Sequence, residues 1–211
     1  MKKLWLIVTG ILFCFASTAF AYTPSEGNIS AYFGPYFYQS ANNNSRDIPQ
    51  PPNQTSPALI VLGDVSDRGS LELGFFVLDK IYSREQNLQY ISEQTKLVHI
   101  TMGYRRWFND TFSGSITLYS AYSMGEVTVL HNDFANTTDV PTSAHETTQY
   151  GFDFSLQAEL WKTEKMAFVL DTRYSRSVTN KSSENADHYG IIFGLHYTLQ
   201  EKVRTANLNK Q

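Results

Sequence analysis

Six segments of this sequence alternate apolar and polar residues over nine or more positions. In the clearest segment the even-numbered residues are all apolar: Tyr150, Phe152, Phe154, Leu156, Ala158 and Leu160. The odd-numbered residues are small or polar: Gly151, Asp153, Ser155, Gln157 and Glu159. We call the odd or even position of a residue along a strand its parity. A period of two places successive side chains on opposite faces of a strand, and about ten residues are enough for a tilted strand to cross a bilayer. The pattern therefore predicts strands with one apolar and one polar face.

The N-terminus has the features of a secretory signal peptide. Two lysines precede an apolar run from Leu4 to Phe15, and the small residues of Ala19-Phe20-Ala21 are typical of a cleavage site. An uncleaved membrane anchor is the alternative, but the apolar run is shorter than the roughly 20 residues of a spanning helix. We predict a cleaved signal peptide over residues 1–21.

Composition limits the chemistry of the exported chain. Removal of residues 1–21 takes away two lysines and no acidic residue, so the formal net charge changes from −3 to −5. The single cysteine, Cys14, is lost with this segment, so the remaining chain depends on neither disulfides nor thiolate ligands. A mildly negative charge also disfavours a nucleic-acid partner. The 14 Phe and 13 Tyr of the chain favour strands over helices, and no cofactor is predicted.

Eight strands are predicted along the chain, with connections that alternate in length. The predicted strands span 28–39, 57–66, 70–83, 94–107, 111–123, 147–161, 165–178 and 187–199. The short connections are 67–69, 108–110 and 162–164, and the long ones, expected to be exposed loops, are 40–56, 84–93, 124–146 and 179–186. An up-and-down membrane barrel keeps short turns in the periplasm and long loops outside the cell. We therefore predict an all-β fold, an eight-stranded antiparallel up-and-down transmembrane β-barrel over residues 22–199, followed by a short polar tail at 200–211.

The composition of the polar face distinguishes a membrane barrel from a soluble one that binds a ligand inside. Between residues 111 and 123 this face is uncharged and mostly small, with Thr111, Ser113, Ser115, Thr117, Tyr119, Ala121 and Ser123. A face in contact with water usually carries several Lys and Glu, so we interpret this one as barrel interior. The opposite face is expected to contact lipid, with Phe112, Ile116, Leu118 and Tyr122 and, in the last strand, Tyr189, Ile191, Phe193, Leu195, Tyr197 and Leu199. A soluble ligand-binding barrel is the alternative.

The last predicted strand carries the most specific motif. Its Gly194-Leu195-His196-Tyr197-Thr198-Leu199 alternates apolar residues after a glycine and is similar to the terminal signal that the barrel-assembly machinery reads. Over residues 22–199 the chain resembles the small outer-membrane β-barrels of Gram-negative bacteria, the OmpA-barrel and OmpX-like group. Family members commonly end on an aromatic residue, whereas here Leu199 is followed by the polar tail. The resemblance implies a monomer in the outer membrane, with outer-membrane lipid, lipopolysaccharide and the barrel-assembly machinery as partners.

Both signs of charge are predicted to face the barrel interior. By parity the inward residues include Glu72, Lys80, His99, Arg105, Asp153, Glu159, Asp171, Arg173, His188 and His196. Because an eight-stranded barrel has room only for side chains, opposite charges there are expected to pair. A tight turn near residue 163 puts Asp153 opposite Arg173 or one pair away, with Asp171 diagonal to both, while Glu72 and Arg105 share a level. We predict a structural plug; a path for protons or solutes, and so a small pore, is the alternative.

A lipid A-modifying enzyme is a further alternative. Some eight-stranded barrels modify lipid A with a His beside Ser or Asp near the outer leaflet, because a His base can activate a hydroxyl or a water. The candidates here lie in the third long connection: His131, Asp133, Ser143, His145 and Glu146. They match no recognisable catalytic motif and no metal-ligand spacing. We therefore predict solvated loop positions and a structural or surface-binding role, with an extracellular ligand bound through the long loops.

Arg105-Arg106-Trp107 is interpreted as a marker of the periplasmic membrane boundary. One Arg is expected to point into the barrel, the other to reach lipid headgroups, and Trp107 to anchor at the interface. Trp161, beside Lys162 at the next short turn, predicts the same level.

Overall fold

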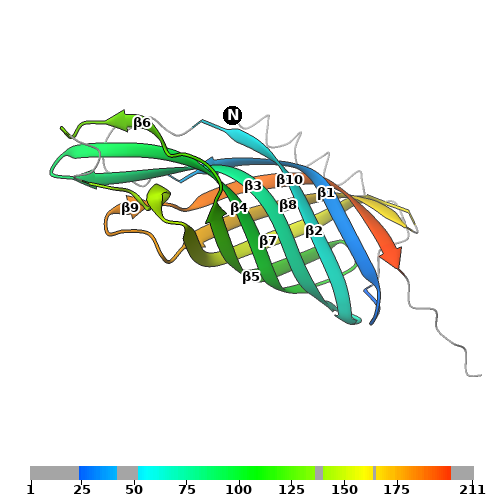
Figure 1. Cartoon of the computed structure of the whole chain (residues 1–211). Coiled ribbons are helices and arrows are strands. Elements are labelled where there is room, and N and C mark those ends of the chain that lie inside the picture. Colours follow the sequence, from blue (N-terminus) through cyan, green and yellow to red (C-terminus); the bar gives the residue numbers. More distant parts are fainter. Residues whose placement is uncertain (1–23, 42–51, 136–139, 164, 201–211) are drawn as a thin grey trace, which may run out of the picture.

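The alternating segments form long antiparallel strands in the computed structural model, which describes residues 24–41, 52–135, 140–163 and 165–200. Eight strands make the barrel wall (Figure 1): β1 (Ile29–Ser40), β2 (Gln54–Ser66), β3 (Gly69–Gln86), β4 (Gln89–Trp107), β5 (Phe112–Ser123), β7 (Thr148–Lys162), β8 (Met166–Ser177) and β10 (His188–Gln200). The connections contain two short strands, β6 (Thr128–Asn132) and β9 (Glu184–Asn185), and a 3₁₀ turn, η2 (Ser143–His145).

The wall strands pair in sequence order, and the first pairs with the last. At this closing seam β1 and β10 are in register from Ser30 with Thr198 to Ser40 with His188. Every wall strand thus has two antiparallel neighbours, and the predicted eight-stranded up-and-down barrel is confirmed. Among the described residues, no helix is long and apolar enough to span a membrane. The predicted signal peptide and residues 201–211 of the predicted tail lie outside the described residues.

The prediction of a long loop at residues 84–93 is wrong. β3 and β4 remain paired up to Gln86 with Gln89, so a two-residue turn joins them. Both turn residues, Asn87 and Leu88, have positive φ, 50° and 69°, as a tight hairpin turn of this kind requires. The alternation of apolar and polar residues fades here because this part of the hairpin projects beyond the barrel (Figure 1).

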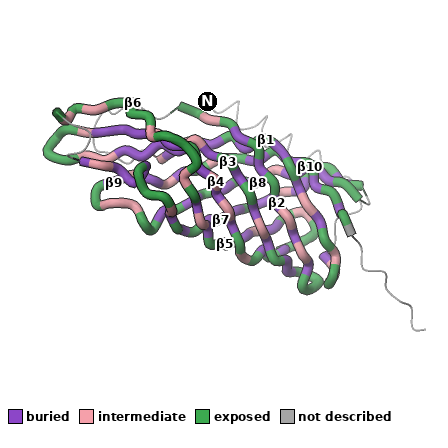
Figure 2. The backbone as a smooth tube through the Cα atoms, viewed as in Figure 1, coloured by how far each residue is buried: buried purple, intermediate pink, exposed green. Residues whose placement is uncertain are grey.

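The two faces of the wall are inverted relative to a water-soluble protein. Figure 2 shows buried and exposed residues alternating along every wall strand. On β7, Phe152 and Phe154 are 39% and 43% exposed, whereas Asp153 between them is 1% exposed. All the side chains that the sequence assigned to the lipid face of 111–123 and of the last strand are also exposed. Large apolar groups therefore cover the outside. The inside holds most of the charged and polar groups of the wall, together with a buried apolar cluster that includes Ile60, Leu62, Phe76 and Leu78.

The two boundary tryptophans face opposite sides of the wall. Trp107 shares the inward parity of Arg105 and is buried, and its indole N–H donates to Ser70 Oγ at 3.4 Å. The predicted interfacial position of Trp107 is therefore wrong, because its parity directs it into the end of the barrel. Trp161 is exposed, since a bulge between Glu159 and Trp161 shifts the register of β7 against β8.

The closing seam makes a prediction about two glycines. A Cβ at Gly34 would lie 1.9 Å from the backbone oxygen of Phe193 on β10, whereas a Cβ at Gly63 meets no atom within 4 Å. We expect Gly34→Ala to lower the free energy of unfolding by about 1–3 kcal/mol or more, because the clash is with backbone. The matched variant Gly63→Ala should stay close to the parent. Urea unfolding followed by tryptophan fluorescence measures both, and an unchanged midpoint for Gly34→Ala would contradict the seam.

Candidate functional site

Four charged side chains from three wall strands meet inside the barrel. Glu72 of β3 accepts from Arg105 Nε of β4 at 2.7 Å and from Arg173 Nη2 of β8 at 2.6 Å. Asp171 Oδ2 lies 3.1 Å from Nη2 of both arginines. All four residues are at most 3% exposed. Two carboxylates and two guanidinium groups therefore balance each other in a space closed to solvent; we call these four residues the ion-pair cluster.

Hydroxyl groups add hydrogen bonds to the ion-pair cluster, although Asp171 Oδ1 and Arg173 Nε and Nη1 have no hydrogen-bond partner among the described residues. Arg105 donates to Ser113 Oγ at 2.9 Å and to Ser155 Oγ at 2.7 Å. Tyr32 donates to Asp171 and accepts from Arg173 Nη2 at 3.2 Å. Small hydroxyl residues thus leave room for two arginines and satisfy several of their donors, which is what a buried ion pair needs to offset its desolvation.

A second polar layer lies above the ion-pair cluster, toward the projecting hairpin. His99 Nε2 lies 3.2 Å from Asp153 Oδ2, and Arg173 Nη1 lies 3.9 Å from the same oxygen. The His99 ring is 5.4 Å from the ring of His188, edge to face. The Lys80 ammonium has no hydrogen-bond partner among the described residues and lies 5.1 Å from the centre of the Tyr82 ring. The charged ammonium group of Lys80 therefore faces an aromatic ring instead of a hydrogen-bond acceptor.

A third polar group lies near the β7–β8 turn. Glu159 forms an ion pair with Lys162, whose Nζ lies 3.0 Å from Oε2, and its Oε1 lies 2.8 Å from His196 Nδ1. Each of the ten residues that parity assigned to the interior is thus buried, and all but Lys80 and His188 have an ionic partner there. The register pairs Asp153 with Ser175 and Arg173 with Ser155, so the two charged residues lie one pair apart.

The end of the barrel away from the short turns is covered by part of the β6–β7 connection. Val140 and Thr142 to Ala144 are buried, so the prediction that residues 124–146 are a wholly exposed loop is wrong for this part. Glu93 of β4 accepts from Thr142 Oγ1 at 2.6 Å. Glu184 of β9 accepts from the backbone N–H and the hydroxyl of Ser143 at 2.6 and 2.5 Å. Two buried carboxylates thus hold this segment, residues 140–145, which we call the cap.

Four of the five loop candidates from the sequence fall into two separate places, and the fifth, Glu146, has its Oε1 3.5 Å from Lys181 Nζ. His131 and Asp133 lie at the projecting hairpin, where Nε2 and Oδ1 are 2.8 Å apart and both side chains are exposed. Ser143 and His145 belong to the cap, where Ser143 bonds to Glu184 and His145 Nε2 lies 3.1 Å from Glu93 Oε1. Each histidine therefore contacts a carboxylate.

The donor set does not resemble a metal site. In the part of the chain that the structure describes, no three His, Cys, Asp or Glu side chains are grouped so as to hold an ion. The sequence reasoning missed Glu93 and Glu184, which hold the cap. Each is a lone acidic residue in a polar segment, so the sequence alone does not identify its role. The role of each becomes visible only in the folded chain.

Comparisons with known proteins bear on the fold. No protein-family model matches the sequence, and no curated protein matches it. Among solved structures, the chain is similar to the outer membrane protein OprG from Pseudomonas aeruginosa, with a TM-score of 0.58 at 10% identity over 85% of this chain and 99% of OprG. It also matches Ail, the attachment invasion locus protein of Yersinia pestis, with a TM-score of 0.45 at 11% identity over 82% of this chain and 99% of Ail. The likeness to OprG shows that this chain has the fold of a small outer-membrane barrel, as the resemblance in sequence implied.

The ion-pair cluster predicts a large cost for removing one charge. We expect Glu72→Gln to lower the free energy of unfolding by about 3–5 kcal/mol, because two buried guanidinium groups lose a carboxylate. Asp79→Asn is the matched control, since Asp79 and Lys96 are 3.8 Å apart and about half exposed, and it should cost at most about 1 kcal/mol. Urea unfolding of both purified variants checks this, and equal costs would show that the buried pairs do not stabilise the barrel.

Proposed function

We propose that this protein is an integral outer-membrane β-barrel with a closed, charge-paired interior and a surface-binding role exercised by the segments that project from it. The inverted faces of the wall carry this proposal. Large apolar side chains exposed over a whole wall are unfavourable in water but match the hydrocarbon of a bilayer. The fold shared with OprG supports the same location.

The connection lengths set the proposed orientation. β2 and β3 are joined by Asp67-Arg68, and the β4–β5 and β7–β8 connections are similarly short. Outer-membrane barrels have short turns in the periplasm. The β3–β4 hairpin, β6, β9 and the cap then lie outside the cell. This orientation fits export by a cleaved signal peptide, insertion of a monomer by the barrel-assembly machinery, and contact of the outer half with lipopolysaccharide.

The interior favours a plug over a pore. The ion-pair cluster connects β3, β4 and β8 across the inside of the barrel through contacts of 2.6–3.1 Å. The cap covers the outer end, and Gln149 donates to the Ser143 carbonyl at 2.9 Å to join the cap to the wall. A solute that crossed this barrel would have to separate buried ion pairs, which costs several kcal/mol.

The projecting sheet offers a surface for recognition. The outer part of β4 pairs with β3 on one side and with β6 on the other. The rings of Tyr90 and His131 stack there at 4.1 Å, and Asp133 Oδ2 accepts from the Tyr90 backbone N–H at 3.1 Å. Leu88 and Leu130 are 69% and 48% exposed on the same sheet. Ordered aromatic, acidic and apolar groups on one projecting sheet are suited to binding a partner outside the cell.

An enzyme acting on outer-leaflet lipid is supported less well. A serine nucleophile needs an adjacent base and access to substrate. Ser143 is 1% exposed and its hydroxyl bonds to Glu184, while His145 contacts Glu93. The hydrogen bonds of these residues hold the cap, so the geometry favours a structural role for them.

The membrane location predicts the effect of a charge on the outer face. Phe154→Arg and Phe193→Arg should each impair insertion, because an arginine at mid-bilayer on this face costs roughly 2–4 kcal/mol. Phe154→Leu and Phe193→Leu are the controls and should insert normally. The fraction of protein that enters lipid vesicles, measured by its heat-modifiable gel migration, checks this, and normal insertion of both arginine variants would refute the facing of the wall.

The closed interior predicts the electrical behaviour of the protein. Purified protein reconstituted in a planar bilayer should give no steady current, because side chains fill the lumen. Insertion is verified separately by heat-modifiable migration of the same preparation. A stable, ohmic conductance from inserted protein would show an open lumen and favour the pore.

A further inference from the structure

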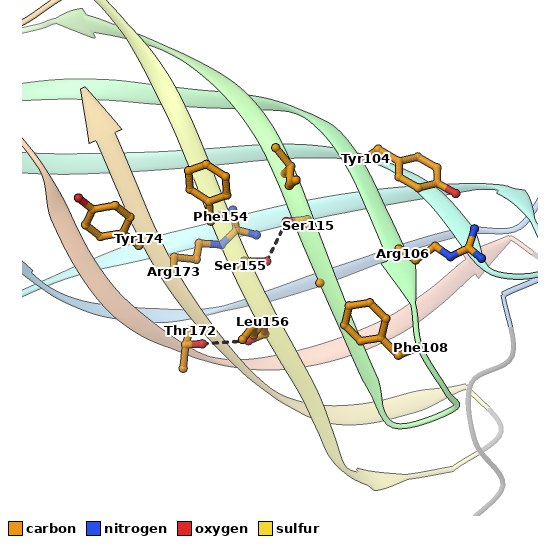
Figure 3. Close-up of a pocket in the computed structure, with 12 residues that line it drawn as sticks. Tyr104, Arg106, Phe108, Ser115, Phe154, Ser155, Leu156, Thr172, Arg173 and Tyr174 are labelled. Carbon is orange, nitrogen blue, oxygen red and sulfur yellow. Dashed lines mark hydrogen bonds between the residues drawn. The ribbon is translucent and has the colours of Figure 1, made fainter. Parts of the chain in front are cut away.

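The outer face of the wall is hollowed beside the β4–β5 turn. Figure 3 shows this groove, whose residues come from β4, β5, β7 and β8, four successive strands of the wall. Its volume is about 750 Å³, within the range of about 300–1,000 Å³ that is usual for small-ligand sites. The groove therefore has the size of a binding site on a face that otherwise meets lipid.

Two neighbouring rows of outward residues explain the hollow. Across the four strands the first row is large throughout, with Tyr104, Ile116, Phe154 and Tyr174. The second row is Arg106, Gly114, Leu156 and Thr172. Gly114 has no side chain, and Thr172 is short and turns its hydroxyl to the Leu156 carbonyl at 3.1 Å. The second row therefore leaves space next to the first, and the polar atom of Thr172 is already satisfied.

Arg106 gives one end of the groove a positive charge. It is exposed, points outward from β4 and lies beside Tyr104 and Phe108 near the β4–β5 turn (Figure 3). Its guanidinium group forms no hydrogen bond or ion pair with the described residues. A long cationic side chain at this level can lay its stem on apolar surface and present its guanidinium group at the headgroup depth.

A second hollow on the outer face lacks this charge. It lies between β1, β2, β3 and β4 and is smaller, about 180 Å³. The described residues that line it, Phe33, Leu59 and Phe75 among them, include no charged side chain. Of these two hollows, the larger is also the one that contains a charged side chain on the outer face, Arg106.

We propose that this groove binds an anionic phospholipid of the periplasmic leaflet. The lipid phosphate accepts bidentate hydrogen bonds from Arg106, and one acyl chain lies over Gly114 between Phe108, Ile116 and Leu156. The inference rests on the proposed function, because the membrane and the periplasmic position of the short turns give the groove its lipid.

Photo-crosslinking in nanodiscs tests the site. Full-length processed protein is placed in phosphatidylethanolamine nanodiscs that contain a minor fraction of phosphatidylglycerol with a diazirine in its acyl chain. A phosphatidylcholine probe with the same acyl chain is the parallel arm. Crosslinked residues are mapped by mass spectrometry, and heat-modifiable migration verifies that every variant is folded and inserted.

Two variants remove the two features of the site. Gly114→Leu fills the groove, and its Cβ would meet only side-chain atoms, Phe108 Cζ at 3.1 Å and Leu156 Cδ2 at 3.3 Å. Arg106→Gln removes the cation, and Arg176→Gln, an exposed residue of β8 outside the groove, is the matched control. We expect Arg106→Gln to lower phosphatidylglycerol labelling of the groove roughly tenfold, the size of one lost charged hydrogen bond. Gly114→Leu should lower it because the new side chain occupies the groove, and Arg176→Gln should change nothing.

The outcomes separate this inference from the proposed function. Labelling spread evenly over the outer face and unchanged by Gly114→Leu overturns the site while leaving the membrane barrel intact. If both probes label the groove equally, and Arg106→Gln does not alter that labelling, the assignment of an anionic lipid is overturned. Protein that does not enter nanodiscs at all, and is labelled nowhere, refutes the proposed function itself.

Discussion

The buried ion pairs between Glu72, Arg105, Asp171 and Arg173 are the constraint on which the rest of the barrel depends. Each buried charge costs several kcal/mol of desolvation, which is offset only when partners and hydrogen bonds are placed accurately. The four groups belong to β3, β4 and β8, so one register of the wall satisfies them. With these charged groups inside, each strand exposes a row of large apolar side chains on its outer face, and this exposed apolar face supports the proposed membrane location.

Much of this architecture could be predicted because the wall strands carry a local signal. Each strand has an apolar outward face, so the alternation predicts which side of the wall a residue faces. Phe154 and Asp153, for example, are 43% and 1% exposed. Parity also placed the interior charges, and a short turn after β7 brought Asp153 within one pair of Arg173. Local alternation is sufficient for these features because neighbouring strands in an up-and-down barrel are also neighbours in sequence.

The features that could not be predicted depend on contacts without a local pattern. Residues 84–93 continue the hairpin outside the barrel, where no apolar band is required and the alternation is lost. The cap depends on Ser143 meeting Glu184, which is 41 residues away, and on Thr142 meeting Glu93, 49 residues away. A lone acid in a polar loop does not identify such a partner, so an exposed loop was the natural expectation. The structure thus joins the cap to the wall, and the sheet of β3, β4 and β6 is the surface to which we assign the proposed binding role.

Protease digestion of intact cells, combined with heat-modifiable gel migration of the membrane-extracted protein, tests the central claim most directly. It measures insertion and orientation in one preparation. The account predicts a compact unheated band, and cleavage confined to the outer segments such as the turn at Asn87-Leu88, while the turn at Asp67-Arg68 is cut only after the cells are opened. A protein that is soluble without detergent, or that is cut at Asp67-Arg68 in intact cells, would contradict the membrane facing or the orientation.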